Sequence, residues 1–207
     1  MKRLLSLLVC SLATLAASSH NVYPIYPTPQ DQYALDGKAS FTKQVNVVVE
    51  EQIDQTTIDR ARQVLTEHGL TPVFTNSIAK KGSNLLLGVA GSKGVVDRHS
   101  TSLSLGREVF DIEGKFDRHI LTLTPDKGAA QVMILGEDTD AVFYGLASLE
   151  QMLDLGTSEL QGVLIEDYAD VEYRGVIEGY YGVPYTAEVT KDLFRFMARF
   201  KMNTYMY

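Results

Sequence analysis

The 207-residue sequence has almost no cysteine and no tryptophan. Its single cysteine is Cys10, so the chain cannot form the internal disulfide framework that holds many small secreted domains together. A large hydrophobic core needs no such crosslinks, so the lack of disulfides does not argue against export. The four histidines have no second histidine or acid at a metal-ligand spacing; they are His20, His68, His99 and His119. We therefore expect no metal site and no cofactor.

Basic residues are also in the minority. Asp and Glu number 26 against 19 Lys and Arg, which gives a net charge of −7. Nucleic-acid binding calls for a basic surface, so we expect no nucleic-acid partner. Hydrophobic residues make up 45% of the chain, an ordinary proportion that at this length allows one or two cores.

The N-terminus has the three parts of a secretory signal peptide. Met1-Lys2-Arg3 is a short basic start, residues 4–15 are almost wholly apolar, and residues 16–19 are small, as at a cleavage site. The apolar run is too short to span a bilayer as a helix. Residues 1–19 are therefore predicted to direct export, to the periplasm or outside the cell. A lipid anchor at Cys10 is an alternative that we disfavour, because Leu7-Leu8-Val9 lacks the small residues expected before a lipidated cysteine.

Residues 20–166 mix strand and helix patterns, which predicts a small α/β domain of the α+β class. Residues 20–36 contain three prolines and are predicted to be an extended opening segment. Strands are predicted at 45–49, 72–75, 84–89, 119–124, 131–135 and 161–165, and helices at 56–68 and 139–155. Lys127-Gly128 is the predicted turn of a hairpin. Residues 167–170 are predicted to be a linker to a second domain.

A glycine-rich segment from Gly88 to Gly94 follows one predicted strand. Such a segment after a strand is typical of phosphate-binding loops. Its glycine spacing fits neither the dinucleotide fingerprint nor the P-loop, and we predict no helix after it. We interpret it as a plain loop.

The stretch from Tyr173 to Tyr207 predicts a strand, a loop, a helix and a second strand. Val176 and Ile177 are β-branched and bracketed by glycines, as in a buried strand. Thr186 is placed to cap a helix. The apolar residues of that helix fall on one face, at Val189, Leu193, Phe196, Met197 and Phe200. Residues 203–207 complete a βαβ unit, the repeat of parallel α/β sheets and barrels.

These residues resemble the start of the catalytic barrel of glycoside hydrolase family 84, which comprises β-N-acetylglucosaminidases, including O-GlcNAc hydrolases, and enzymes labelled hyaluronidases. The similarity lies in RGVIEGYYG at 174–182, PY at 184–185 and KMNTYMY at 201–207. Tyr185 stands where the family usually has Trp. The preceding region resembles the small domain found before the barrel in families 84 and 20. The resemblance implies an α+β domain of this pre-barrel type, followed at 167–207 by the first βαβ unit of a truncated TIM (β/α)8 barrel.

The same resemblance implies removal of terminal β-linked N-acetylglucosamine from a glycan or glycoprotein, by retaining, substrate-assisted catalysis with two adjacent aspartates. No two aspartates are adjacent in this sequence. We therefore expect the catalytic residues beyond Tyr207, and expect these 207 residues to be an inactive N-terminal fragment. Gly179 and Tyr181 match substrate-binding positions of the family. The glycine there offers its carbonyl to a sugar hydroxyl, and the aromatic residue lines the pocket for the 2-acetamido group.

Two nearby charged residues are given structural roles. Glu178 is a single carboxylate, whereas cleavage of a glycosidic bond ordinarily uses a pair. We interpret it as a residue that orients the loop. Arg174 is predicted to form a buried ion pair at the bottom of the barrel.

Two other hypotheses remain open. A family 20 β-hexosaminidase would share the first domain and the D-Y-x-x-x-x-Y-R-G pattern at 167–175, although that family usually has Asp and Ser-Arg-His near the position of residues 178–182. The first domain could instead be a non-catalytic carbohydrate-binding or structural module. The sequence offers no aromatic platform that we can place in support of such a module.

Overall fold

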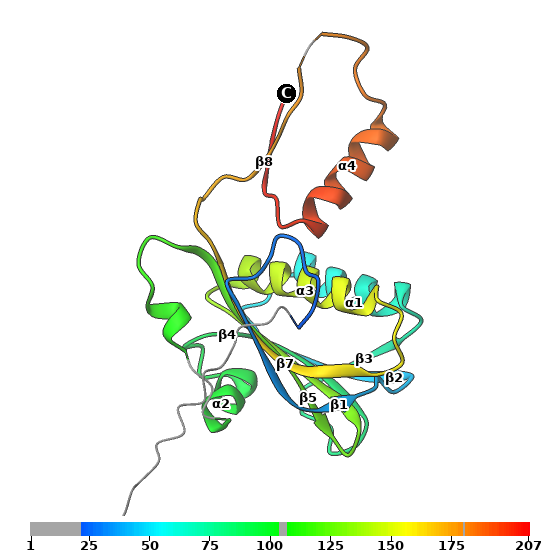
Figure 1. Cartoon of the computed structure of the whole chain (residues 1–207), viewed down its shortest axis with the longest axis vertical. Helices are drawn as coiled ribbons and strands as arrows, with labels where there is room; N and C mark the ends of the chain where they lie inside the picture. Colours follow the sequence, from blue (N-terminus) through cyan, green and yellow to red (C-terminus); the bar gives the residue numbers. More distant parts are fainter. Residues whose placement is uncertain (1–21, 104–106, 180) are drawn as a thin grey trace, which may run out of the picture.

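The computed structural model describes residues 22–103, 107–179 and 181–207. The predicted signal peptide at 1–19, with Cys10, lies outside these residues. The described chain forms a layered domain with one large sheet, followed by a small unit that extends from its helical side (Figure 1).

Seven strands form one mixed sheet in the order β1-β7-β5-β6-β4-β2-β3. Neighbouring strands are parallel from β6 to β3, and antiparallel from β1 to β6. The strands are β1 Asp31–Ala39, β2 Gln44–Val49, β3 Thr71–Thr75, β4 Ser83–Val89, β5 Phe116–Asp126, β6 Ala129–Gly136 and β7 Leu160–Ala169.

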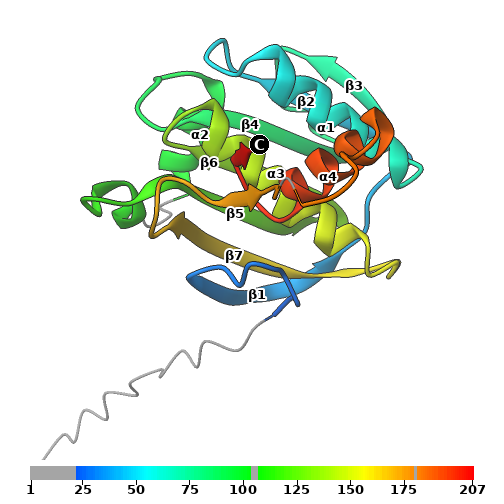
Figure 2. The same ribbon diagram turned by 90° about the horizontal axis from the view of Figure 1, so that it is seen from above.

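Two helices cover one face of this sheet, α1 Gln55–Glu67 and α3 Thr139–Leu153 (Figures 1 and 2). Asp54 and Asp138 cap them by accepting hydrogen bonds from backbone N–H groups three residues on. The main core lies between these helices and the sheet, and includes Val47, Leu65, Leu87, Leu121, Ile134, Leu146 and Leu149. A smaller core forms on the opposite face under α2 Val95–Ser102, beside the 3-10 helix η1 Glu108–Asp111.

The predicted hairpin is confirmed. β5 and β6 pair antiparallel, with Asp126 opposite Ala129. Lys127 and Gly128 both have positive φ, 52° and 84°. This is the conformation that two-residue hairpin turns require.

Three local predictions were wrong. Residues 31–39, placed largely in the opening segment, form β1 at the sheet edge, with a register irregularity against β7. Residues 167–169, predicted as linker, continue β7. Helix α2 follows the glycine-rich loop although no helix was predicted there. The domain boundary at 166/167 stays a prediction, although β7 runs through it.

The C-terminal unit consists of β8 Gly175–Ile177, α4 Ala187–Arg199 and β9 Thr204–Met206. β8 and β9 pair in parallel, and Thr186 caps α4 as predicted. The predicted fold class, an α+β domain followed by a βαβ unit, is thus confirmed. Within α4 only Met197 is buried, so this unit has little core of its own.

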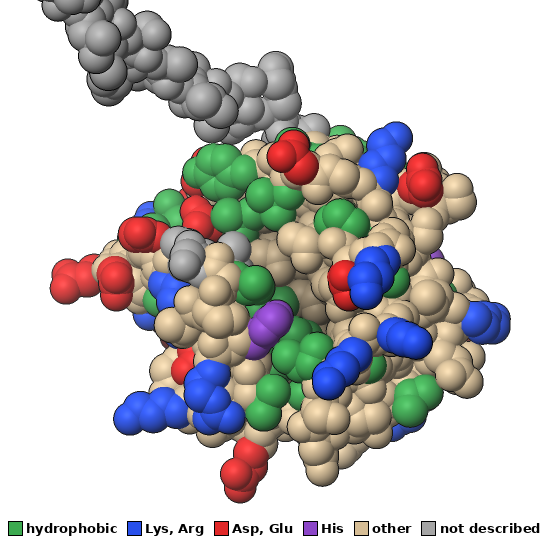
Figure 3. All heavy atoms as spheres, turned by 90° about the horizontal axis from the view of Figure 1, so that it is seen from below, with side chains coloured by type: hydrophobic (Ala, Val, Ile, Leu, Met, Phe, Trp, Pro, Cys, Tyr) green, Lys and Arg blue, Asp and Glu red, His purple; other side chains and the backbone are tan. Residues whose placement is uncertain are grey.

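The face of the molecule away from α1 and α3 shows hydrophobic and basic side chains interspersed (Figure 3). In the described residues no helix has the length and apolar character needed to cross a membrane.

Candidate functional site

The carboxyl end of β8 carries the residues predicted to bind substrate. The pairing of β8 with β9 continues past β8, where the N–H of Glu178 donates to the carbonyl of Met206 at 2.8 Å. The two strands approach closely at Gly175, because a Cβ there would lie 1.5 Å from the carbonyl oxygen of Thr204. Gly175 thus permits the pairing that places the following loop.

Glu178 is held from the helix side of the strand pair. Its carboxylate accepts a hydrogen bond from the hydroxyl of Tyr205. The Tyr205 ring packs edge-on against Phe194 of α4, with centroids 5.2 Å apart. Ile177, the preceding residue, is 76% exposed, as alternation along a strand would place it on the other face. This geometry supports the interpretation of Glu178 as a loop-orienting residue.

Gly179 and Tyr181 lie close together beyond the end of β8. A Cβ on Gly179 would be 3.2 Å from Cδ2 of Tyr181, and the Tyr181 side chain is fully exposed. Both line an open hollow of about 640 Å³, together with Val183, Tyr185, Leu193 and Phe196. Apolar walls with a few polar groups are typical of small-molecule sites. The substrate-binding roles of the two residues stay predictions.

Arg174, at the start of β8, joins the C-terminal unit to the first domain. Its guanidinium pairs with Asp117 of β5 and lies over the ring of Tyr144 of α3, 5.4 Å from the centroid. Burial raises the pKa of the Asp117 carboxyl even though Arg174 acts to lower it. The predicted ion pair of Arg174 is present, but its partner belongs to the first domain.

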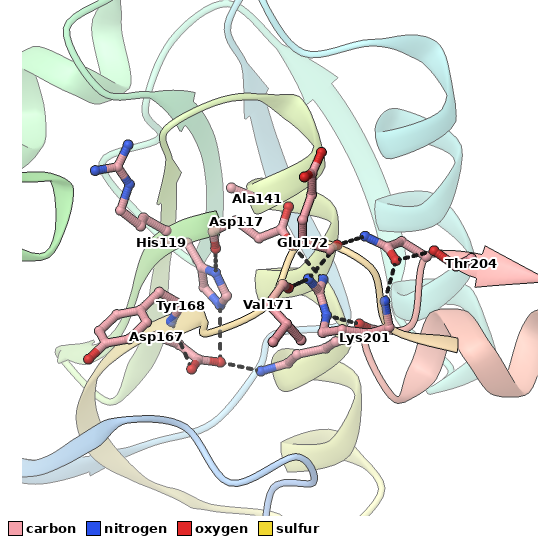
Figure 4. Close-up of polar contacts among 12 residues, drawn as sticks. Asp117, His119, Ala141, Asp167, Tyr168, Val171, Glu172, Lys201 and Thr204 are labelled. Carbon is pink, nitrogen blue, oxygen red and sulfur yellow. Dashed lines mark hydrogen bonds and ion pairs between the residues drawn. The ribbon is translucent and has the colours of Figure 1, made fainter. Parts of the chain in front are cut away.

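A second polar cluster lies beside it, shown in Figure 4. Lys201 Nζ is 2.6 Å from Oδ2 of Asp167, and both side chains are 8% exposed. His119 Nδ1 lies 2.8 Å from the carbonyl oxygen of Asp117, so this nitrogen carries the proton and donates. Burial lowers the pKa of His119 to about 4, against the raising effect of Asp167. His119 is therefore neutral at pH 7, and its 3.8 Å approach to Asp167 is not an ion pair.

These residues line a cavity of about 300 Å³ between the first domain and the C-terminal unit. Its carboxylates face cations, in the pairs Asp117–Arg174, Asp167–Lys201 and Asp170–Lys115. Each of these three carboxylates is already engaged by a cation, so their arrangement is that of structural ion pairs. The residues around this cavity connect the first domain to the C-terminal unit. The hollow at Gly179 is open and mostly apolar, as a binding site is.

The sequence did not point to Asp117, Asp167, Lys201 or Tyr205 as parts of either cluster. Each of them contacts a residue that is distant in the sequence, as Asp117 contacts Arg174. A single sequence does not show which distant residues form such pairs. One signal was present. Lys201 follows the last turn of α4, where glycine is the usual residue.

Among residues 22–103, 107–179 and 181–207, no group of three or more His, Cys, Asp or Glu side chains is arranged to hold a metal ion.

Comparison with known proteins gives two consecutive family matches. Residues 22–168 match the model of glycosyl hydrolase family 20, domain 2. Residues 174–207 match the model of β-N-acetylglucosaminidase. The solved structure of CpGH84D superimposes with a TM-score of 0.80 and 37% sequence identity, over 88% of this chain and 30% of that one.

The chain belongs to the glycoside hydrolases of the family 20/84 type, with a first domain that matches domain 2 of family 20 and a C-terminal unit that matches β-N-acetylglucosaminidase. The family 84 resemblance carried by residues 174–207 is confirmed by the second model and by CpGH84D. The structure of CpGH84B, at 23% identity and a TM-score of 0.60, shares the fold. So does an inactive mutant of a GH20 exo-β-N-acetylglucosaminidase from Vibrio harveyi, at 18% identity and 0.64, over 92% of this chain and 26% of that one.

This glycoside hydrolase chain spans about 30% of the length of the two family 84 structures. Its first domain and its βαβ unit therefore correspond to a part of those proteins.

Proposed function

We propose that this chain forms the first part of an exported β-N-acetylglucosaminidase that removes terminal β-linked N-acetylglucosamine from a glycan or glycoprotein. The observation that carries the proposal is the position of Gly179 and Tyr181. They follow β8 within the segment that matches β-N-acetylglucosaminidase, and they line an open hollow at its carboxyl end. Barrel enzymes build their active sites at the carboxyl ends of strands.

The mechanism is proposed to be retaining and substrate-assisted, one of the exceptions to the scheme with a carboxylate nucleophile. The 2-acetamido oxygen of the sugar attacks the anomeric carbon while the bond to the leaving oxygen breaks. One aspartate orients the acetamide, and its neighbour protonates the leaving oxygen. That neighbour then takes a proton from water as the water oxygen bonds to the anomeric carbon. The bond between that carbon and the acetamido oxygen breaks, which opens the oxazoline and restores the acetamide.

The residues of this chain would bind and orient the sugar. An exposed backbone at Gly179 lets a ligand approach the main chain closely. The carbonyl there would accept a hydrogen bond from a ring hydroxyl. Tyr181 would provide an apolar wall with a polar tip beside the acetamido group. Glu178, fixed by Tyr205, would hold this loop in place.

Export rests on the sequence of residues 1–19, with the periplasm and the extracellular space as possible destinations. A lipid anchor at Cys10 is not part of the proposal, because residues 7–9 are not the small residues expected before a lipidated cysteine.

The test is hydrolysis of an aryl N-acetylglucosaminide by a protein that continues this chain through the rest of a barrel. Tyr181→Ala should lower kcat/KM about 10- to 100-fold, which corresponds to the loss of about 1.4–2.7 kcal/mol of binding. Tyr173→Ala is the matched control, because Tyr173 is also exposed but precedes β8.

Equal effects of the two substitutions would contradict the role of Tyr181. A protein of residues 20–207 alone should show no turnover, since it has no adjacent aspartates. Hydrolysis by this shorter protein would contradict the proposed mechanism. An Asp-Glu pair in place of Asp-Asp further along the longer protein would favour the family 20 alternative.

A further inference from the structure

Two residues at the contact between the first domain and the C-terminal unit have an unusual backbone conformation. In the described part of the chain, the non-glycine residues with positive φ are Lys93, Asp117, Lys127 and Lys201. Lys93 lies in a loop, Lys127 lies in a turn, and Lys201 follows the end of α4, all places where such angles are common. Asp117, by contrast, lies within β5. Asp117 and Lys201 face each other's domains across the contact. A strained residue of this kind persists only where the surrounding structure holds it in that conformation.

Asp117 owes its position to a bulge in β5. The pairing of β5 with β7 shifts register between Phe116 and His119. Bulges re-aim side chains out of the regular pleat. The Asp117 carboxylate is thereby directed past the sheet to Arg174, and both side chains are 18% exposed.

Arg174 in turn fixes the start of the C-terminal unit. Its Nε donates to the carbonyl of Lys201 at 3.0 Å, and its Nη1 donates to the carbonyl of Val171 at 2.8 Å. Its own carbonyl accepts from the N–H groups of Asn203 and Thr204 at 2.7 and 2.9 Å. Arg174, whose side chain is held by Asp117, thus binds together the first residues of β8 and β9.

Lys201 provides a second attachment. It follows α4 at the position where glycine usually ends a helix, and its ammonium reaches Asp167 in β7. The other oxygen of Asp167 accepts from the N–H groups of Tyr168 at 2.9 Å and Gln30 at 3.3 Å. The carboxylate is therefore positioned by the first domain before Lys201 binds it.

The C-terminal end of α4 makes a third attachment, to α3. Arg199 pairs with Asp154, and its carbonyl accepts from the side-chain amide of Gln151 at 3.1 Å. The same amide donates to the carbonyl of Tyr26 at 2.8 Å. Helix α3 thus links the opening segment of the chain to α4.

The charges on the two sides are complementary. The first domain contributes a docking surface formed by Asp117, Tyr144, Gln151, Asp154 and Asp167. The C-terminal unit contributes three cations, Arg174, Arg199 and Lys201. By contrast, α4 buries only Met197, and Ile177 and Met206 are 76% and 55% exposed.

We propose that this docking surface orders the β8–α4–β9 unit by itself, without further strands beside β8 and β9. The unit has too little core to be stable alone, whereas three ion pairs and the hydrogen bonds of Arg174 fix both strand starts and the end of the helix. The inference concerns the assembly of the chain and does not depend on the proposed sugar chemistry.

Hydrogen exchange of the intact 207-residue chain tests this directly. The amides of Glu178 and Thr204 report on the unit, since both are hydrogen-bonded between its strands. We expect at least 100-fold protection of both amides. Asp167→Asn should lower that protection at least 10-fold, while amides of β6 in the first domain keep theirs. Asp170→Asn is the matched control. Asp170 lines the same cavity and pairs with Lys115, but its side chain is 64% exposed.

Lys201→Met is a second test of the same ion pair, and it is needed if Asp167→Asn unfolds the first domain. This substitution removes the cation from the C-terminal unit alone, and it should lower the protection of Glu178 and Thr204 by a similar factor. Exchange of these amides at the rate of an unstructured peptide in the unmodified chain would overturn the proposal. So would full protection in Lys201→Met, because the unit would then be ordered without its buried attachment.

Discussion

Glu50 shows how one carboxylate shapes the glycine-rich loop. It is 6% exposed at the end of β2. One oxygen accepts from the N–H groups of Val96 and Asp97 at the start of α2, and the other accepts from the N–H of Val89 and the hydroxyl of Ser92. An anion at a helix N-terminus is stabilised by the free N–H groups and the helix dipole. The protein thus places its own carboxylate where a phosphate-binding loop would hold its ligand.

Replacing Glu50 by Gln should therefore destabilise the fold. The amide group would set an N–H₂ against backbone N–H donors that now have an acceptor, and a buried donor left unpaired costs about 1–3 kcal/mol. We expect the free energy of unfolding to fall by about 2 kcal/mol. Urea denaturation measures this.

Glu51→Gln is the control for charge, because Glu51 is the adjacent residue and is exposed. Equal denaturation midpoints for the two variants would show that the hydrogen bonds of Glu50 do not support the loop.

At the scale of elements, the sequence was informative where the signal was local. Helices α3 and α4 follow from a capping residue and a regular apolar face, and the β5–β6 hairpin follows from Lys127-Gly128. The start of α2 has no such signal, because its N-cap is Gly94 and the carboxylate that satisfies its N–H groups comes from Glu50 in another strand. β1 is an irregular edge strand, and its pattern is broken between Ala34 and Lys38.

The pairing of β8 with β9 depends on the absence of a side chain at Gly175. Since a Cβ would meet the carbonyl of Thr204, Gly175→Ala should separate the two strands. We expect the protection of the Glu178 amide to fall at least 10-fold in hydrogen exchange, while the first domain is unaffected. Gly182→Ala is the matched control, because a Cβ at Gly182 meets nothing within 4 Å. Unchanged protection in Gly175→Ala would contradict the observed strand spacing.

The sequence predicted the residues of the candidate site that belong to a local motif, but not the residues that support them from other strands. Gly179 and Tyr181 were identified from a motif, and they do lie together at the end of β8. The support for their loop comes from Tyr205, whose hydroxyl reaches Glu178 from the neighbouring strand. Such a contact depends on strand register, which the sequence of one strand does not determine.

At the scale of the whole molecule, stability should depend on pH through His119. This side chain is 1% exposed, and its pKa is lowered to about 4 mainly by burial. The charged groups that act on it are Asp167, Lys201 and Glu137, and the backbone carbonyl of Asp117 accepts its hydrogen bond. Between about pH 6.5 and pH 4 the unfolded chain binds a proton at His119 that the folded chain does not. Stability is therefore full above pH 6.5 and falls as the pH is lowered.

The difference in pKa corresponds to a loss of about 3 kcal/mol by pH 4. It is measured as the free energy of unfolding at a series of pH values. His119→Asn keeps a donor toward the carbonyl of Asp117 but has no ionisable ring, so its stability should vary less with pH. Parallel pH curves for the two proteins would show that His119 is not responsible.

The bulge at Asp117 and the position of Asp167 have a consequence for biosynthesis. Both residues precede Arg174 and Lys201 in the chain, so the ribosome completes the docking surface before it makes the cations that bind there. At roughly 5–20 residues per second, the β8–α4–β9 unit emerges within seconds of a domain able to receive it. The exposed apolar side chains of the β8–α4–β9 unit would then be held at one place on a folded partner, where they are less free to associate with other chains.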